Sequence, residues 1–195
     1  MTAQNHPQKP EMGTRMLPFS RELYIERSDF MENPPKKFFR LGPGREVRLR
    51  YGYYLTCVSY ETDTSGTVTL LHCTYDPQTK GGTSPDGRKV KGTIHWVSAE
   101  HAVDADVYLY DRLFTVEHPD ADKATDFKSY INPDSRRIVR DCKLEPSLAA
   151  LEPGKQVQFE RQGYFCLDSV LTTPEKAVFN RVVTLRDSWA RQQGK

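Results

Sequence analysis

The feature that most constrains this chain is a succession of short segments rich in β-branched and aromatic residues. In the clearest segment, 46–51, Val47 and Leu49 alternate with Arg48 and Arg50. Strict alternation is typical of a strand with one buried side and one side facing solvent. Segments of the same kind recur along the chain, so most of it is predicted to be β-structure. We expect strands at 23–25, 46–51, 53–60, 67–75, 90–98, 107–114, 137–144, 157–161, 164–167 and 178–185.

Turn chemistry separates these segments. Residues 63–66 have the composition of a hairpin turn, and the Gly- and Pro-rich stretch 77–87 predicts a flexible loop. Helical patterns are weak and limited to 121–130 and 147–150. About ten short strands exceed what one small barrel needs, and 195 residues can hold two small domains. We therefore expect an all-β chain of two packed antiparallel β-barrels with few short helices. Residues 1–17 are polar and interrupted by prolines, which predicts a linker or tail.

Composition excludes several classes of protein. No apolar run approaches the ~20 residues that span a bilayer, and the first residues lack the apolar core of a secretory signal. A cytoplasmic protein with no membrane partner is expected. The four cysteines include no C-x-x-C pair and the five histidines are scattered, so no metal site is predicted. The common nucleophile, metalloprotease and nucleotide-binding motifs are absent, and no catalytic residue is proposed.

The net charge of only +2 hides a local concentration of cations. Between positions 36 and 50 six basic residues face the single acid Glu46, with Phe38 and Phe39 among them. Alternation places Arg48 and Arg50 on one strand face, ~6.5–7 Å apart. Cations that track a backbone beside aromatic rings are typical of single-stranded RNA binding. The plainer interpretation is a solvated strand face with salt bridges. A second basic run, 88–91, is more simply a strand edge protected by lysine.

An ordered set of segments resembles the C-terminal anticodon-binding region of glutaminyl-tRNA synthetase, a class I aminoacyl-tRNA synthetase. The longest are DGRKVKGTIHWVS at 86–98 and QFERQGYFCLD at 158–168, and EVRLR stands at 46–50. Shorter matches follow in family order and extend the resemblance over nearly the whole chain. They lie at 5–7, 18–20, 27–30, 73–76, 110–114, 131–133, 145–148, 179–181 and 185–189.

The resemblance implies a fragment of a longer enzyme. In the family, a proximal barrel holds an inserted distal barrel. Mapped onto this chain, residues 1–17 precede the barrels, 18–34 and 112–189 form the proximal barrel, 35–111 form the distal barrel, and 190–195 are a C-terminal tail. The full-length family enzyme is an ATP-dependent glutamine–tRNA ligase that uses Mg. This fragment lacks its catalytic domain and is expected to be inactive alone, with no cofactor of its own. The expected partners are the anticodon loop of tRNA-Gln and the catalytic domain of the same polypeptide, in a monomer.

The resemblance also assigns roles in reading the splayed anticodon, CUG or UUG. Arg48 and Arg50 match the Arg-x-Arg pair that engages the first anticodon nucleotide. Gln158 matches the glutamine at the middle uridine, and Arg161 lies nearby in the same segment. A further middle-base arginine of the family lies upstream of this chain, so weak binding by the isolated fragment is expected.

At the residues matched to the third anticodon base, this sequence departs from the family pattern. Arg40 matches the arginine that reads this guanine, and an arginine can meet the two acceptors of guanine with two donors. Some members have a lysine directly before this arginine, where Phe39 stands here. Some have glutamine where Lys37 stands. We expect Lys36 or Lys37 to supply the cation instead.

Three other interpretations remain. The chain resembles the equivalent region of a eukaryote-type or archaeal glutamyl-tRNA synthetase, although the match at 158–161 favours the glutaminyl enzyme. A free-standing RNA-binding β-barrel protein, like the ribosomal protein that binds 5S rRNA, is the second; it has one barrel and matches only part of the chain. A pure interaction module is the third, and it predicts no salt-sensitive RNA binding.

Overall fold

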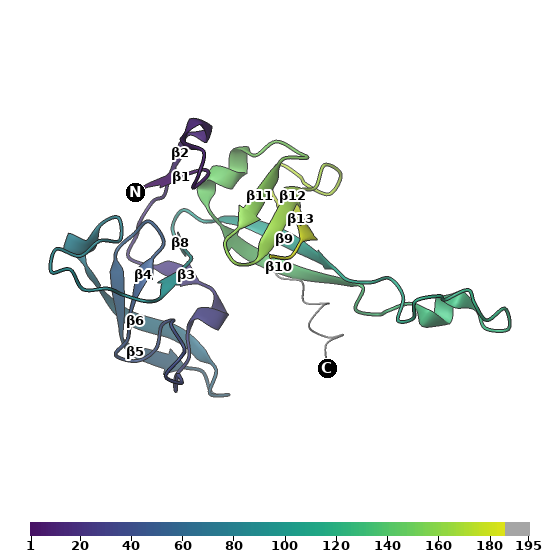
Figure 1. Cartoon of the computed structure of the whole chain (residues 1–195), viewed down its shortest axis with the longest axis horizontal. Coiled ribbons are helices and arrows are strands. Elements are labelled where there is room, and N and C mark those ends of the chain that lie inside the picture. The colour runs from purple at the N-terminus through teal and green to yellow at the C-terminus, as the bar shows by residue number, and fades with distance from the viewer. Residues whose placement is uncertain (186–195) are drawn as a thin grey trace. The chain divides into compact units, whose positions relative to one another are not determined.

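The computed structural model describes residues 1–185, and this part of the chain is all-β, which confirms the predicted class. Its helical segments are five short 3-10 turns (Figure 1). The strands are β1 (Thr2–Gln4), β2 (Thr14–Met16), β3 (Leu23–Ile25), β4 (Glu46–Leu49), β5 (Tyr54–Thr62), β6 (Val68–Asp76), β7 (Thr93–Ile94), β8 (Trp96–Ser98), β9 (Val103–Tyr110), β10 (Arg136–Leu144), β11 (Gln156–Phe159), β12 (Gly163–Leu167) and β13 (Ala177–Val183). The 3-10 turns are η1 (Pro10–Met12), η2 (Arg27–Asp29), η3 (Pro77–Thr79), η4 (Phe127–Tyr130) and η5 (Pro146–Ala150).

The chain divides into two compact units, Met1–Ala102 and the part that starts at Val103. In the first unit a four-stranded sheet has the order β6-β5-β4-β7, and β1-β2 and β3-β8 form two small ribbons. In the second unit one sheet has the order β10-β9-β13-β12-β11. Neighbouring strands are antiparallel except for β4–β7 and β9–β13. These pairings define sheets, and closure of each sheet into a barrel stays a prediction.

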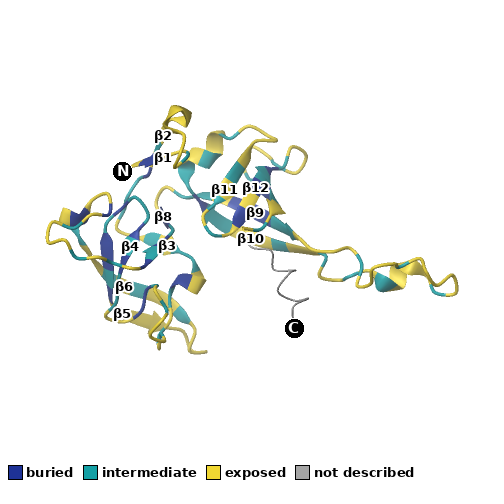
Figure 2. Ribbon diagram, viewed as in Figure 1, coloured by how far each residue is buried: buried dark blue, intermediate teal, exposed yellow. Residues whose placement is uncertain are grey.

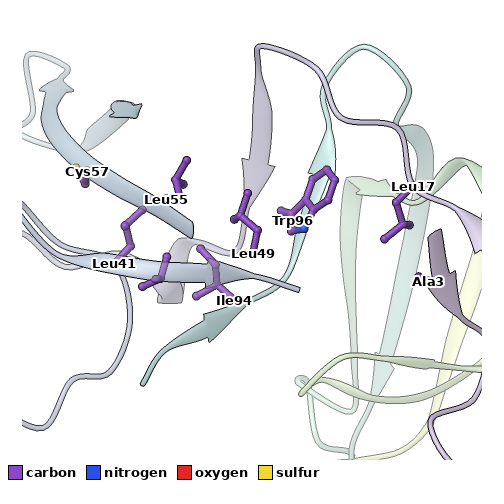
Figure 3. Packing of buried hydrophobic residues seen from close by; sticks show 9 residues of the cluster. Ala3, Leu17, Leu41, Leu49, Leu55, Cys57, Ile94 and Trp96 are labelled. Atoms are coloured by element: carbon purple, nitrogen blue, oxygen red, sulfur yellow. The ribbon is translucent and has the colours of Figure 1, made fainter. Parts of the chain in front are cut away.

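The core of the first unit follows from alternation in β4. Val47 and Leu49 are 1% and 0% exposed, whereas Glu46 and Arg48 are half-buried. Figure 2 shows buried and intermediate stretches on the strands of this unit. The apolar side chains come from the hairpin at the N-terminus, from β4 and β5, and from β7 and β8. Figure 3 shows this cluster, which contains Ala3, Leu17, Leu41, Val47, Leu49, Leu55, Cys57, Ile94 and Trp96. Their burial fixes which face of β4 remains available to a partner.

The second unit has a separate core built around three phenylalanines. Phe159 stacks on Phe165 with ring centroids 4.3 Å apart, and Phe179, which is fully buried, lies 5.3 Å from Phe159. The connection between β9 and β10 forms a long extension that projects from this sheet (Figure 1). Each unit therefore has its own hydrophobic support.

Residues 1–17 differ from the expected linker. Strands β1 and β2 pair as a hairpin, with Ala3 opposite Arg15, and Ala3 and Leu17 are buried. Gly13, with φ of 77°, closes the turn, and its amide donates to the carbonyl of Pro10. Each strand has only three residues, too few to show alternation in the sequence.

The expected grouping of 18–34 with 112–189 stays a prediction. In the structure, strand β3 pairs with β8, so Leu23–Ile25 lies in one ribbon with Trp96–Ser98. The predicted strand 107–114 is found at Val103–Tyr110. The expected end of the proximal barrel at 189 and the tail 190–195 lie outside the described residues.

Candidate nucleic-acid interface

Arg48 is held in a defined position on β4. Its Nε donates to Oγ1 of Thr93 at 3.1 Å, and its Nη1 lies 3.5 Å from the carbonyl oxygen of Gly82. Gly82 belongs to the loop that follows η3 and has φ of +86°. A Cβ at this glycine would lie 2.5 Å from Cδ of Arg48. The loop therefore packs directly on the arginine side chain, and this leaves Arg48 half-buried.

Arg50 lies in the turn that follows β4, because the strand ends at Leu49. Its guanidinium lies 4.8 Å from the ring centroid of Tyr51, and that of Arg15 lies 6.0 Å from the same ring. Tyr51 has φ of 61°, a left-handed conformation that is uncommon for residues other than glycine. The indole of Trp96 donates to the carbonyl of Arg50 at 3.0 Å, which ties this turn to the core.

The loop that carries Lys36 and Lys37 is organised by Arg45. This guanidinium donates to the carbonyls of Pro34 at 2.8 Å, Pro35 at 3.3 Å and Phe38 at 2.6 Å. Both lysines are exposed, and no ion pair is found for either among residues 1–185. The donors of Arg45 are therefore used within the protein, where they hold the loop. The two lysines of this loop are exposed to solvent.

Arg40 contacts a buried carboxylate. Its Nη1 lies 3.3 Å from Oδ1 of Asp29, which is fully buried, and donates to the carbonyl of Ser28 at 2.9 Å. The Arg40 side chain is still 37% exposed. A guanidinium has five donors in a rigid fork, so these contacts orient it without using every donor.

In the basic run 88–91, the charge of Arg88 is paired with carboxylates of the protein. Arg88 is bound to Glu46 through two hydrogen bonds of 3.1 Å, to Asp76 at 2.6 Å and to Asp86 at 2.7 Å. It also lies 5.2 Å from the ring centroid of Tyr54. This residue joins β4, the end of β6 and the Gly-rich loop, so its charge is used within the protein.

The two aspartates of this network are stabilised in their charged form. The hydrogen bond from Arg88 is the main cause that lowers the pKa of Asp76. The pKa of Asp86 falls to about 2, chiefly because the Ser84 hydroxyl donates to it, helped by the backbone and side chain of Arg88. The hydrogen bonds of Arg88 to Glu46 first, and then to Asp76 and Asp86, raise the pKa of Arg88 above its ordinary value. At neutral pH Asp76, Asp86 and Arg88 are therefore charged.

The remaining predicted residues lie in the second unit. Gln158 is exposed on β11, where it pairs with Tyr164 of β12. Arg161 lies in the β11–β12 turn with φ of 63° and is half-buried. The predicted residues thus belong to both units: Lys36, Lys37, Arg40, Arg48 and Arg50 to the first, and Gln158 and Arg161 to the second. We call these sets the β4 patch and the β11 patch.

Residues 1–185 contain neither a metal-binding cluster nor a membrane-spanning helix. No group of three or more His, Cys, Asp or Glu side chains there could hold a metal ion. That same part of the chain contains no helix with the length and apolar character needed to cross a membrane. What the described surface offers is fixed cations beside aromatic rings, an arrangement suited to phosphate oxygens and base edges.

Comparisons with known proteins identify relatives of the chain. A family model described as "tRNA synthetases class I (E and Q), anti-codon binding domain" matches residues 1–76, and a second model with the same description matches 93–168. Glutamine–tRNA ligase of Nitrobacter winogradskyi is 56% identical over 191 residues, 98% of this chain and 34% of the relative. That of Tolumonas auensis is 56% identical over 185 residues, 95% of this chain and 33% of the relative. The Escherichia coli O157:H7 enzyme is 53% identical over 98% of this chain and 34% of its own length. The chain spans about a third of the length of these relatives.

Proposed function

Because the chain belongs to the anticodon-binding domains of class I tRNA synthetases of the E and Q type, we propose that it binds the anticodon loop of tRNA-Gln. The observation that carries this proposal is the similarity to glutamine–tRNA ligases, which extends over 98% of the chain at 56% identity. The β4 patch supports it, since its arginines are positioned by other parts of the protein before any RNA arrives. Preorganised donors lose less conformational entropy on binding than mobile side chains do.

In this proposal, each nucleotide of the anticodon is contacted by residues of the β4 patch or of the β11 patch. Arg48 and Arg50 engage the first nucleotide, and Arg40 reads the third-position guanine with the donors that Asp29 and Ser28 leave available. Lys36 and Lys37 contact phosphates as compact charges. Gln158 and Arg161 recognise the middle uridine. Splayed bases expose their edges to such donors, which is how sequence is read in single-stranded RNA.

The longer protein is proposed to be a glutamine–tRNA ligase that attaches glutamine to tRNA with ATP and Mg²⁺. The catalytic domain lies in the part of the polypeptide that this chain does not include, and we place no cofactor in the fragment. We further propose that the enzyme is a cytoplasmic monomer.

Binding of anticodon stem-loops tests the proposal. The CUG and UUG loops of tRNA-Gln should compete better than a UUC loop, which carries a glutamate anticodon. Arg48→Ala and Arg50→Ala should each weaken CUG binding by about 5- to 150-fold, the equivalent of ~1–3 kcal/mol. Arg112→Ala, which removes an exposed arginine of the second unit, is the control. Preference for UUC would favour a glutamate enzyme, and equal binding of all three loops would indicate a general RNA-binding protein.

A further inference from the structure

Lys91 and Phe39 come together from distant parts of the sequence. The Nζ of Lys91 lies 5.3 Å from the ring centroid of Phe39, which is 52% exposed. Phe39 belongs to the loop before β4, whereas Lys91 ends the basic run 88–91 just before β7. An ammonium within ~6 Å of a ring centroid is attracted by the negative face of the ring. The lysine is therefore directed to a defined place on an open surface.

Glycine at position 92 permits this approach. The amide of Arg48 donates to the carbonyl of Gly92 at 2.8 Å, because β4 and β7 pair in parallel. A Cβ at position 92 would lie 2.5 Å from the carbonyl oxygen of Phe39 and 3.2 Å from Cγ1 of Val47. The backbone before β7 is thus wedged between β4 and the Phe39 loop. Lys91 directly precedes this wedge in the chain.

The charge of Lys91 is available, in contrast to that of Arg88 three residues earlier. Arg88 is bound to three carboxylates. Within residues 1–185 no ion pair is found for Lys91, which is exposed. An ammonium placed on an aromatic ring and without a carboxylate partner is suited to a phosphate oxygen.

We propose that Lys91 is a further RNA-binding residue of the β4 patch, where it contacts a backbone phosphate and Phe39 positions its ammonium. This inference rests on the proposed function for the identity of the partner. It extends the site from the residues of one basic run to a residue 41 positions beyond Arg50. Phe39 is a positioning residue, since it acts through the lysine.

Salt-dependent binding of the CUG stem-loop tests the inference. Lys91→Met keeps the apolar stem and removes the charge, and it should weaken binding by about 3- to 10-fold at low salt. Loss of one phosphate contact should also reduce the slope of log K against log salt concentration by about 0.7. Lys89→Met is the matched control, because Lys89 is an exposed lysine of the same basic run for which no ring contact is found in the described residues. It should change the affinity by less than about 2-fold.

A double-mutant cycle tests the role of Phe39. Phe39→Leu should weaken binding by about 2- to 5-fold in the wild-type background and by much less in Lys91→Met, since coupled residues are not additive. An unchanged affinity and salt slope in Lys91→Met would overturn the inference, and so would equal losses in Lys89→Met and Lys91→Met. If the wild-type protein binds CUG and UUC loops equally, the proposed function itself fails. If it prefers CUG and Lys91→Met binds normally, only the role of Lys91 fails.

Discussion

At the scale of single residues, the position of Arg48 depends on a missing side chain. Gly82 packs against Arg48 and has φ of +86°, whereas Gly81 has a similar φ of +84° but nothing within 4 Å of the place of its Cβ. Alanine at either position incurs the cost of a left-handed backbone, about 1–2 kcal/mol. Only alanine at position 82 also collides with the arginine. The two glycines therefore separate backbone strain from displacement of Arg48.

We predict that Gly81→Ala and Gly82→Ala lower the free energy of unfolding, while only Gly82→Ala weakens binding of the CUG stem-loop. The displaced guanidinium loses its hydrogen bond to Thr93 and with it the orientation proposed for the first anticodon nucleotide. Urea denaturation gives the stability of both variants, and titration with the stem-loop gives the affinity. Equal affinities in the two variants would show that Arg48 tolerates the added methyl group.

The sequence predicts the strand face on which an arginine lies, but it does not predict the partners of that arginine. Alternation at 46–49 is enough to place Arg48 opposite the buried Val47 and Leu49, and the structure has it so. Arg45 and Arg88 look like the other cations in the sequence, yet both are bound within the protein. Their partners cannot be predicted from spacing, since Glu46 is 42 residues from Arg88 and the partners of Arg45 are backbone carbonyls.

At the scale of elements, the Arg88 network connects β4, β6 and the Gly-rich loop, which do not pair directly with one another. It links Glu46 on β4 and Asp76 at the end of β6 to Asp86 in the Gly-rich loop. Both aspartates have a lowered pKa in the folded protein. A carboxylate with a lowered pKa stabilises the fold above its unperturbed pKa, and this contribution is lost as pH falls towards the folded value. The loss occurs here between the unperturbed pKa of 3.8 and, for Asp86, about 2.

We predict that Arg88→Gln is less stable than the wild type at neutral pH and loses less further stability below pH ~4. The difference arises mainly from Asp76, because Arg88 is the main cause of its lowered pKa, whereas Asp86 keeps the Ser84 hydroxyl. Urea denaturation from about pH 7 to about pH 2.5 measures it. Arg112→Gln, which breaks an exposed pair with Asp111 of 3.9 Å, should follow the wild-type curve. Parallel acid limbs for wild type and Arg88→Gln would contradict the assignment.

The sequence predicts every strand of four or more residues and, among the shorter ones, β3 at its observed bounds, but not β1 or β2. Strands β5, β6 and β10 have nine residues each, and all three lie close to their predicted ranges. The predicted strand at 90–98 is divided into β7 and β8, two short strands that pair with different partners. Such a division depends on tertiary contacts such as the wedge at Gly92, which leave no periodic signal.

At the scale of the whole molecule, each proposed RNA-binding patch is supported by a core of its own. The β4 patch rests on the cluster around Leu49 and Ile94, and the β11 patch on the cluster around Phe165 and Phe179. The resemblance in sequence predicts the residues of both patches. It does not predict which hydrophobic core supports each patch. Arg48 and Gln158 share no partner among the described residues and belong to different units.

We therefore predict that the effects of Arg48→Ala and Gln158→Ala on CUG binding are additive within about 0.5 kcal/mol. Residues with separate supports and separate nucleotides should lose their contacts independently, unless the loop itself must be splayed by both patches at once. Titration of the wild type, both single variants and the double variant with one stem-loop completes the cycle. Arg40→Ala combined with Arg48→Ala is the comparison within one patch, where coupling is expected because both residues act from the first unit. A coupling energy above about 1 kcal/mol between Arg48 and Gln158 would show that the RNA, or the protein between the units, transmits the loss of one contact to the other.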